Sequence, residues 1–533
     1  MELNLKSLKE DRAEWEAAGF SLPSYDIDAL RAQTKKAPEW LHFGPGNIFR
    51  GFIGSIAEKL IESGELKSGI VAVADYDMEI IDKIYDPFDM LTLSVGLARD
   101  GKKSLAVTAS IADSIKAAVE QERMREIAAS DSLKMVSYTV TEKGYVVRDA
   151  NGDPIPPVRD EIAAGPEAPK TVMGNTTALL YYRYKAGGAP IAIVSMDNCS
   201  ANGDRLKASV LYIAEQWKKN GKVDEGFLAY IQDESRVSFP CSMIDKITPR
   251  PDTEVAKELE AMGIKDMSPV VTQKGTYIAP FVNAENPQYL VVEDRFPNGR
   301  PPLEKAGVYM ADRKTVDLSE KMKVMSCLNP LHTALAVCGC LLGYKKISDE
   351  MEDADLNALV HALGEEGMQV VADPGIIHPR DFLNEVLTER LPNPGLPDTP
   401  QRIATDTSQK MPIRFGGTIR SYDELGKASE LKVVPFVIAA WLRYLAGKDD
   451  EGKEMELSSD PLLAELKEQL AACRFAEEIT DTAAVEKLLS REDIFASDLT
   501  KCGDLAERII ASYKKLMSGA GAVRRELHAL VSA

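Results

Sequence analysis

The feature that most constrains the fold is a glycine turn placed between two apolar segments. Residues 39–43 form a short apolar run that leads directly into Gly44-Pro45-Gly46. A helical pattern follows the turn and ends at a glycine, and residues 69–75 then have the composition of a buried parallel strand. The order strand, glycine turn, helix, strand is typical of α/β proteins built on a doubly wound parallel sheet.

The rest of the chain divides into a strand-rich part and a helical part. Residues 133–141 and 190–197 are further apolar segments followed by turn-forming residues, so we expect them to be strands of the same sheet. Strand patterns become rare after about residue 310. A chain of 533 residues also exceeds the roughly 250–300 residues that one core accommodates. The sequence therefore predicts a Rossmann-type domain over residues 1–310 and a mainly α-helical domain over residues 311–533.

The composition argues against several classes of partner. The formal net charge is −19 and no long basic run occurs, so neither nucleic acid nor a membrane surface is expected. No segment reaches the roughly 18 consecutive apolar residues of a membrane helix, and the N-terminal residues lack the apolar core of a secretory signal. Seven scattered cysteines suit a reducing compartment. We expect a cytoplasmic protein that is a monomer or a small homo-oligomer.

Metal binding is not expected either. No two of the five histidines lie at the spacing of metal ligands. Cys338 and Cys340 stand inside an apolar run, where we expect burial as small hydrophobic side chains.

The glycine turn is a candidate site for a dinucleotide. Gly44 and Gly46 let the backbone turn tightly and approach a pyrophosphate, which then lies at the positive N-terminus of the helix. The third glycine of the usual fingerprint is absent, and Phe49 stands in its place. Arg50 follows at a position from which it could reach a phosphate. The alternative is an ordinary tight turn.

Asp75 ends the next strand, where an acidic side chain can accept hydrogen bonds from the ribose diol of NAD. The same carboxylate would repel the 2′-phosphate of NADP, so we expect NAD as the cofactor. Asp77 competes for this role, and Asp75 could instead cap a helix.

Two further strand ends carry polar residues. Thr141, Glu142 and Lys143 follow one strand, and Asn198 follows another. Ligands of doubly wound sheets bind at the carboxyl ends of the strands, so these residues are candidates for ligand contact. Residues 141–143 could equally form a charged surface turn, and Asn202 begins an Asn-Gly turn that we expect to be structural.

Lys323, Asn329 and His332 could surround one reacting hydroxyl group. Oxidation of an alcohol without a metal needs a base for the hydroxyl proton, and a lysine serves if its surroundings lower its pKa. Asn329 precedes a proline, so its role could be limited to capping a helix. His332 could be an ordinary core histidine. Arg402 and Lys410, eight residues apart, could bind substrate oxygens or form a solvated loop.

Several motifs occur in a fixed order, among them GPGNIFRG, TEKGY, SMDN, FPCSMIDKITP, NPLH and RIA-x-D-x-x-x-K. Together they resemble the polyol-specific long-chain dehydrogenases, the family of mannitol 2-dehydrogenase and the hexuronate reductases. The resemblance runs from about residue 38 to 415. It implies an N-terminal Rossmann-type domain, a helical C-terminal domain and a lysine as general base.

The resemblance also assigns roles to single residues. It implies catalytic roles for four of them, which are Lys323, Asn329, His332 and Asn198. It implies substrate binding by Asp245, Arg402 and Lys410. The candidate cofactor-binding residues are Gly44, Gly46, Asn47, Ile48, Phe49, Arg50, Asp75, Thr141, Glu142 and Lys143.

The chain departs from the family pattern at three places. Lys323 and Asn329 are six residues apart where the family has five, Pro330 replaces a small residue, and Cys241 replaces an asparagine. We expect NAD-dependent interconversion of a hexonate and a ketohexuronate, with D-mannonate and D-fructuronate favoured. The alternatives are mannitol, the altronate and tagaturonate pair, or a nucleotide-binding regulator without catalysis.

Overall fold

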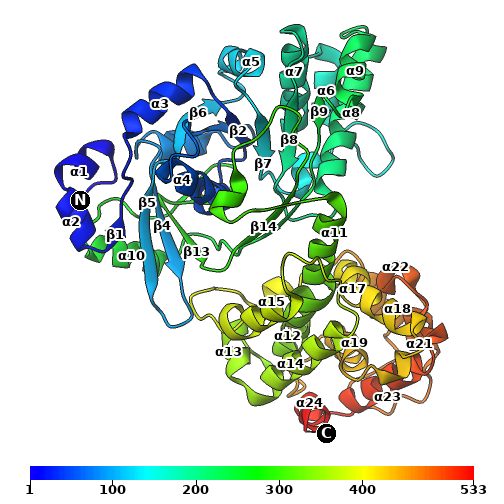
Figure 1. The fold of residues 1–533 in the computed structure, drawn as a ribbon. Coiled ribbons are helices and arrows are strands. Elements are labelled where there is room, and N and C mark those ends of the chain that lie inside the picture. Colours follow the sequence, from blue (N-terminus) through cyan, green and yellow to red (C-terminus); the bar gives the residue numbers. More distant parts are fainter. Residues whose placement is uncertain (533) are drawn as a thin grey trace. The chain divides into compact units, whose positions relative to one another are not determined.

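The computed structural model describes residues 1–532, which form two compact units. The first unit contains residues 1–98 and 102–317, and the second contains residues 99–101 and residues 318 onward (Figure 1). The sequence predicted a boundary after residue 310, and the structure divides after Asp317.

The first unit is built on a six-stranded sheet in which all neighbouring strands are parallel. The spatial order of its strands is β6 (Ile111–Lys116), β3 (Ile70–Ala74), β2 (Trp40–Phe43), β7 (Met135–Tyr138), β8 (Ile191–Ser195) and β9 (Val237–Ser238). Numbered along the chain, this order is 3-2-1-4-5-6, which is the order of a dinucleotide-binding doubly wound sheet. The predicted fold class is confirmed.

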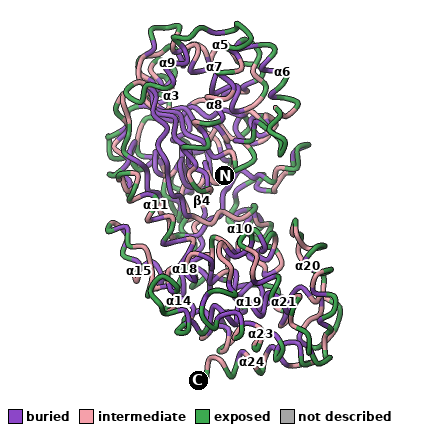
Figure 2. Tube along the Cα trace, turned by 90° about the vertical axis from the view of Figure 1, so that its right-hand side faces the viewer, coloured by how far each residue is buried: buried purple, intermediate pink, exposed green. Residues whose placement is uncertain are grey.

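Alternating side chains of the strands pack against helices on both faces of this sheet. Leu41 and Val71 belong to one hydrophobic cluster, which includes residues of α7 (Val172–Lys185) and α8 (Asn202–Lys219). Trp40 and Ala72 belong to the other cluster, which includes residues of α4 (Gly54–Glu62). Burial of both faces explains why the strands are continuous apolar runs. Figure 2 shows that the centre of the first unit is buried.

The first unit also contains smaller sheets that the sequence did not predict. One has the strand order β1 (Phe20–Ser21), β5 (Lys103–Thr108), β4 (Thr92–Leu97) and β13 (Phe281–Glu285). The others are β10 (Ser242–Asp245), β14 (Tyr289–Glu293) and β15 (Tyr309–Ala311), and the pair β11 (Val270–Val271) and β12 (Tyr277–Ile278). The remaining helices of this unit are α1 (Leu5–Glu10), α2 (Arg12–Ala17), α3 (Ile27–Lys36), α5 (Gln121–Ala129), α6 (Pro156–Ala164), α9 (Glu225–Gln232) and α10 (Thr253–Ala261).

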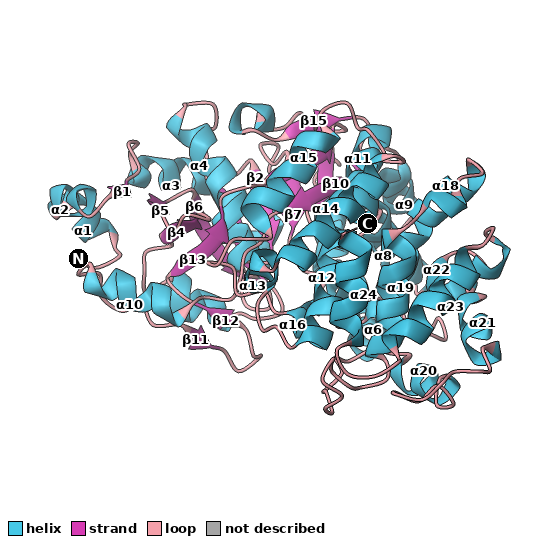
Figure 3. Ribbon diagram, turned by 90° about the horizontal axis from the view of Figure 1, so that it is seen from below, coloured by secondary structure: helices cyan, strands magenta, loops and turns pink. Residues whose placement is uncertain are grey.

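The second unit is helical, and no strand is assigned between residues 318 and 532 (Figure 3). Its helices are α11 (Arg313–Lys321, which begins in the first unit), α12 (Asn329–Leu342), α13 (Ile347–Glu352), α14 (Ala354–Met368), α15 (Pro379–Glu385), α16 (Pro400–Ile403), α17 (Thr407–Met411), α18 (Gly417–Glu424), α19 (Val433–Tyr444), α20 (Leu463–Gln469), α21 (Ala483–Leu489), α22 (Glu492–Phe495), α23 (Leu505–Leu516) and α24 (Ala522–Val531). The predicted helical character is confirmed.

The longest helical segment is apolar because it is a core element. Residues Arg313–Leu342 run through α11, a π-helical turn and α12, and are long and apolar enough to cross a membrane by composition alone. However, 83% of the most apolar window is buried within the protein. Cys338 and Cys340 are buried on α12 as predicted.

Candidate active site

The glycine turn lies where the two halves of the six-stranded sheet meet, between β2 and β7. Gly44 has a φ of +98°, and a Cβ atom there would lie 2.1 Å from the carbonyl oxygen of Thr139, so only glycine fits. A Cβ at Gly46 would meet nothing within 4 Å, so the backbone there is open to a ligand. The helix that begins at Asn47 presents its N-terminus to this opening. These features fit a pyrophosphate group.

The next residues of the helix show which side chains remain available to a ligand. Asn47 donates a hydrogen bond to the carbonyl oxygen of Tyr277 at 3.2 Å, but its Oδ1 atom is buried without a partner. Ile48 is half-buried and packs against the hydrophobic cluster. Phe49 is fully buried and stacks on His42, with 4.0 Å between ring centroids. The aromatic ring thus replaces the third glycine as a packing element.

Arg50 does not have the role that the sequence suggested. Its guanidinium group is buried and donates to Thr92 Oγ1 at 3.1 Å, to the carbonyl oxygen of Ala279 at 2.7 Å and to that of Pro280 at 3.0 Å. All three nitrogen atoms are therefore engaged within the protein. The expectation that Arg50 reaches a phosphate is wrong, because the side chain holds the helix against the chain near β13.

Asp75 lies directly after β3 and is half-buried. Its carboxylate accepts a hydrogen bond from Asn175 Nδ2 at 2.6 Å, and no helix N–H group within residues 1–532 binds it. Burial, with the nearby charge of Glu161, raises the pKa of Asp75 to about 7. The competing residue, Asp77, is buried and accepts from the Thr272 hydroxyl at 2.6 Å. Asp75 is thus the more available of the two carboxylates.

Residues 141–143 form a turn whose backbone is held in place by hydrogen bonds. The buried carboxylate of Asp197 accepts hydrogen bonds from the backbone N–H groups of Val140 at 3.0 Å and Thr141 at 2.8 Å. Thr141 has a φ of 65°, an unfavourable value for a threonine that costs about 1–3 kcal/mol. The side chains of Thr141, Glu142 and Lys143 are exposed, and Glu142 pairs with Arg205.

The segment after β8 contains two asparagines in different surroundings, Asn202 and Asn198. Asn202 is fully buried, and its amide nitrogen donates to the carbonyl oxygens of Asp197 at 2.9 Å and Ser242 at 3.0 Å. The expectation that Asn202 is structural is confirmed. Asn198 is exposed at the tip of the same turn. Asp245 is buried at the end of β10.

In the second unit, Lys323 lies in a π-helical turn, Met322–Cys327, and is 2% exposed. The backbone N–H of Leu328 donates to the carbonyl oxygen of Lys323 at 3.1 Å, which is a hydrogen bond between residues five apart. A π turn holds one residue more than an α turn and is frequent at functional sites. This turn therefore has room for the additional residue between Lys323 and Asn329.

Asn329 and His332 lie one turn apart at the start of α12, on the same face of the helix. No side chain caps this helix, so the capping role considered for Asn329 is wrong. His332 Nε2 is buried without a hydrogen-bond partner, so His332 is not a satisfied core histidine. His42 in the first unit is one, since its two ring nitrogens contact Ser137 and Thr139.

Charged side chains surround His332. Asp398 Oδ2 lies 3.6 Å from His332 Nε2, and the other oxygen of Asp398 accepts from Arg402. Lys410 donates to the carbonyl oxygens of Ile403, at 3.0 Å, and Thr405. The pKa of Lys410 is lowered to about 8, mainly by burial and to a smaller extent by repulsion from Arg414.

Three charged residues near His332 were missed from the sequence, namely Asp398, Arg414 and Arg390. Arg414 is half-buried, and its Nη1 donates to the carbonyl oxygen of Asn329 at 3.4 Å and to the hydroxyl of Thr333. Asp398 is buried ahead of α16. The only local signal for Asp398 was its proline-rich segment, LPNPGLPDTP, which precedes Arg402.

Family models identify both parts of the chain. The mannitol dehydrogenase Rossmann domain matches residues 38–305, and the mannitol dehydrogenase C-terminal domain matches residues 315–517. The chain belongs to the mannitol dehydrogenase family. The predicted resemblance and the predicted enzyme class, an oxidoreductase, are thereby confirmed.

Relatives within the mannitol dehydrogenase family match over almost their full length. The D-mannonate oxidoreductase of Thermotoga maritima is 49% identical and covers 100% of this chain and 99% of its own. A crystal structure of D-sorbitol dehydrogenase has a TM-score of 0.79 at 26% identity, covering 96% of this chain and 97% of that chain. The mannitol 2-dehydrogenase of Pseudomonas fluorescens, solved with NAD and D-mannitol, has a TM-score of 0.74 at 26% identity and covers 100% of both chains.

Proposed function

We propose that the chain interconverts a hexonate and a ketohexuronate, D-mannonate and D-fructuronate, with NAD as the cofactor. The observation that carries the proposal is a group of cations in a strongly acidic chain. Arg402 and Arg414 lie close enough to His332 to lower its pKa, and Lys410 lies near both arginines. Cations gathered against the overall charge suit an anionic substrate. The name of the Thermotoga maritima relative agrees with this substrate.

The first unit supplies the residues for NAD. The open backbone at Gly46 and the helix N-terminus at Asn47 suit the pyrophosphate, and the unpartnered Oδ1 of Asn47 offers an acceptor beside it. Asp75 would accept hydrogen bonds from the adenosine ribose. When bound, NAD supplies the acceptor for the hydride. The structural neighbour from Pseudomonas fluorescens contains NAD, which supports this choice.

The second unit supplies the residues for the substrate and its proton. As hydride leaves the alcohol carbon, Lys323 takes the hydroxyl proton and the carbon–oxygen double bond forms. Asn329 and His332 hold the oxygen on which this happens, and Arg402 and Lys410 bind the carboxylate or nearby hydroxyls. The family resemblance further predicts a catalytic role for Asn198 and substrate binding by Asp245. We propose no metal for this chemistry, since Lys323 itself accepts the proton.

The structure removes the main reason to consider a non-catalytic regulator. That hypothesis rested on the additional residue between Lys323 and Asn329, and the π turn accommodates it. We further propose that the protein acts in the cytoplasm as a monomer or small homo-oligomer. All seven cysteines are free thiols, which agrees with a reducing compartment.

The test is a comparison of kcat/KM for D-mannonate, D-altronate and D-mannitol with NAD. We expect mannonate to be the best substrate, with mannitol at least tenfold poorer, about 1.4 kcal/mol. A tenfold preference for mannitol would overturn the proposal of a uronate substrate, and a preference for altronate would reassign its stereochemistry.

A further inference from the structure

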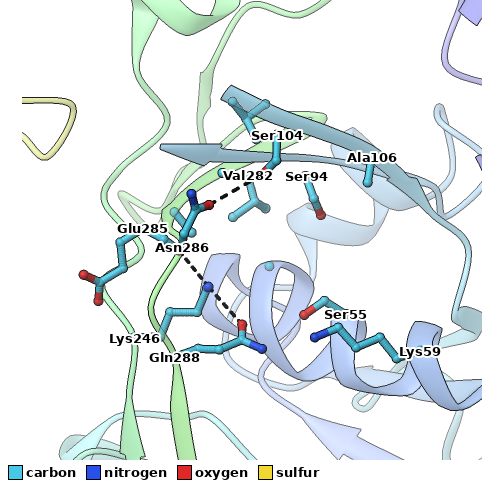
Figure 4. A pocket seen from close by; sticks show the side chains of 14 residues that line it. Ser55, Lys59, Ser94, Ser104, Ala106, Lys246, Val282, Glu285, Asn286 and Gln288 are labelled. Atoms are coloured by element: carbon cyan, nitrogen blue, oxygen red, sulfur yellow. Dashed lines mark hydrogen bonds between the residues drawn. The ribbon is translucent and has the colours of Figure 1, made fainter. Parts of the chain in front are cut away.

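A cavity of about 500 Å³ lies in the first unit between the helix that follows the glycine turn and the four-stranded sheet (Figure 4). Gly51, Ser55 and Lys59 line it from the helix side. The opposite wall is formed by residues 94–96 of β4, by Ser104 and Ala106 of β5, and by five residues in and after β13, which are Val282, Ala284, Glu285, Asn286 and Gln288. Lys246 completes the lining. Neither the glycine turn nor Asp75 lines this cavity, so it is separate from the residues proposed to bind NAD.

Small residues allow the two walls to approach each other closely at Gly51 and Gly96. Elsewhere they leave the space between the walls unfilled. A Cβ atom at Gly51 would lie 2.6 Å from Val282 Cγ1, so the helix contacts the sheet closely there. A Cβ atom at Gly96 would lie 2.2 Å from Ser104 Oγ and 2.3 Å from Asn286 Oδ1. The other wall residues include serine and alanine, which are too short to fill the cavity.

The interior of the cavity is polar. Ser94 Oγ is buried and has no hydrogen-bond partner among residues 1–532, although leaving a buried hydroxyl unpaired costs about 1–3 kcal/mol. Asn286 and Ser104 share a hydrogen bond of 3.5 Å, and Gln288 accepts from Lys246 at 3.0 Å. Figure 4 shows these side chains on the walls of one common space. A ligand hydroxyl would complete the hydrogen bonding of Ser94.

The charge of the lining is positive. Of the fourteen lining residues, Lys59 and Lys246 are cationic and only Glu285 is acidic. Glu285 is buried and its Oε1 accepts from the backbone N–H of Ile247 at 2.6 Å. Lys59 is exposed and makes no ion pair with any residue between 1 and 532. Excess positive charge in a polar cavity favours an anion.

We propose that this cavity binds a small oxyanion that carries hydroxyl groups, of the size of a triose phosphate or a short sugar acid. Lys59 and Lys246 bind the oxyanion, and Ser94 with Asn286 binds the hydroxyl groups. The volume falls within the roughly 300–1,000 Å³ of small-molecule sites. This site goes beyond the proposed oxidoreductase activity and does not depend on it.

The test is calorimetric titration of glycerol 3-phosphate into the full-length enzyme saturated with NADH and D-mannonate, an unreactive pair that keeps both the cofactor site and the substrate site filled. We expect one site per chain. Lys59→Gln should weaken binding at least tenfold, about 1.4 kcal/mol. The matched control is Lys67→Gln, which removes an exposed lysine just beyond the same helix and should leave binding unchanged. Neither variant should change turnover with NAD, which also reports that each is folded.

Two further titrations define the ligand class. Inorganic phosphate should bind more weakly than glycerol 3-phosphate, and Ser94→Ala should remove that difference. Glycerate in place of glycerol 3-phosphate tells whether a carboxylate or a phosphate is preferred, and either preference supports the site. Absence of binding by both ligands, equal binding by the Lys59→Gln variant, or equal binding of inorganic phosphate and glycerol 3-phosphate would overturn the proposal.

Discussion

Asp398 Oδ2 lies 3.6 Å from His332 Nε2, just beyond hydrogen-bonding distance, while its other oxygen accepts from Arg402. The side chain of His332 is only 14% exposed. Burial lowers the pKa of His332 to about 4, although the charge of Asp398 raises it. His332 is therefore a neutral imidazole near pH 7, with one ring nitrogen left for a ligand oxygen.

We predict that His332 causes no break in the pH profile of kcat/KM near pH 6.5, the usual pKa of histidine. Protonation of His332 should reduce activity only when the pH falls toward 4, because the folded chain favours the neutral ring. Asp398→Asn removes the charge that raises this pKa and should move the break lower. The measurement is the pH profile of kcat/KM. A break between pH 6 and 7 that disappears in His332→Asn would contradict the assignment.

Lys323→Ala should lower kcat by about 10²–10⁴, the range for loss of a general acid or base. The Kd for NAD should change little, because the residues proposed to bind NAD belong to the first unit. Lys321→Ala is the matched control, since Lys321 is an exposed lysine two residues earlier. If Lys321→Ala caused the loss instead, Lys323 would not be the base.

Substitution of Asp75 should change the cofactor preference, whereas substitution of Asp77 should change the thermal stability. The wild-type enzyme should prefer NAD over NADP at least tenfold, about 1.4 kcal/mol, and Asp75→Ser should reduce that preference. Asp77→Ala should keep the preference and lower the Tm, because it removes the acceptor of a buried hydrogen bond from Thr272. Steady-state kinetics with both cofactors and a thermal melt separate the two roles. A preference that survives Asp75→Ser would reject the ribose contact.

The central sheet could be predicted because its signals are local. Each of its four predicted strands is a short apolar run followed by turn residues, and the structure places β2, β3, β7 and β8 within those runs. The predicted segment 133–141 is longer than β7, because Asp197 binds the backbone of Val140 and Thr141 and turns the chain there. That contact joins residues more than fifty positions apart, so no local pattern contains it.

The same reason explains the misassigned and missed residues. Arg50 binds carbonyl groups about 230 positions away, so its sequence position beside the glycine turn was misleading. Arg414 contacts Asn329 and Thr333 only through the packing of the second unit. The π turn at Met322–Cys327 also has no composition that distinguishes it from an α-helix. Local propensity predicts elements, whereas these contacts depend on which elements become neighbours.

Glu350→Gln should stabilise the protein increasingly as the pH rises. Glu350 is fully buried, and neither carboxylate oxygen has a hydrogen-bond partner in the part of the chain that the structure describes. Burial raises its pKa from 4.5 to about 10, so the folded chain holds a proton that the unfolded chain releases. Wild-type stability is therefore lost as the pH rises from about 4.5 toward 10, by up to about 1.4 kcal/mol per pH unit. Glutamine does not titrate and avoids this loss.

The measurement for Glu350 is the difference in Tm between variant and wild type at pH 5 and at pH 8. The difference should be larger at pH 8. Glu352→Gln, an exposed change at the end of the same helix, should show no such dependence on pH. A difference that stays constant with pH would show that Glu350 is ionised in the folded protein.

Substitutions of Arg402 and of Arg414 should differ in how they affect the acidic substrate and the neutral one. Arg402 is largely exposed and bound on one side by Asp398, so its remaining donors can reach a substrate carboxylate. Arg402→Ala should raise KM for D-mannonate at least tenfold and change KM for D-mannitol less. Arg414 holds the backbone of Asn329 at 3.4 Å, so Arg414→Gln should lower kcat for both substrates alike. Arg420→Ala, on the exposed surface of α18, is the control and should change neither. Equal loss on both substrates in Arg402→Ala would mean that no carboxylate binds there, and the acid specificity would have to arise elsewhere.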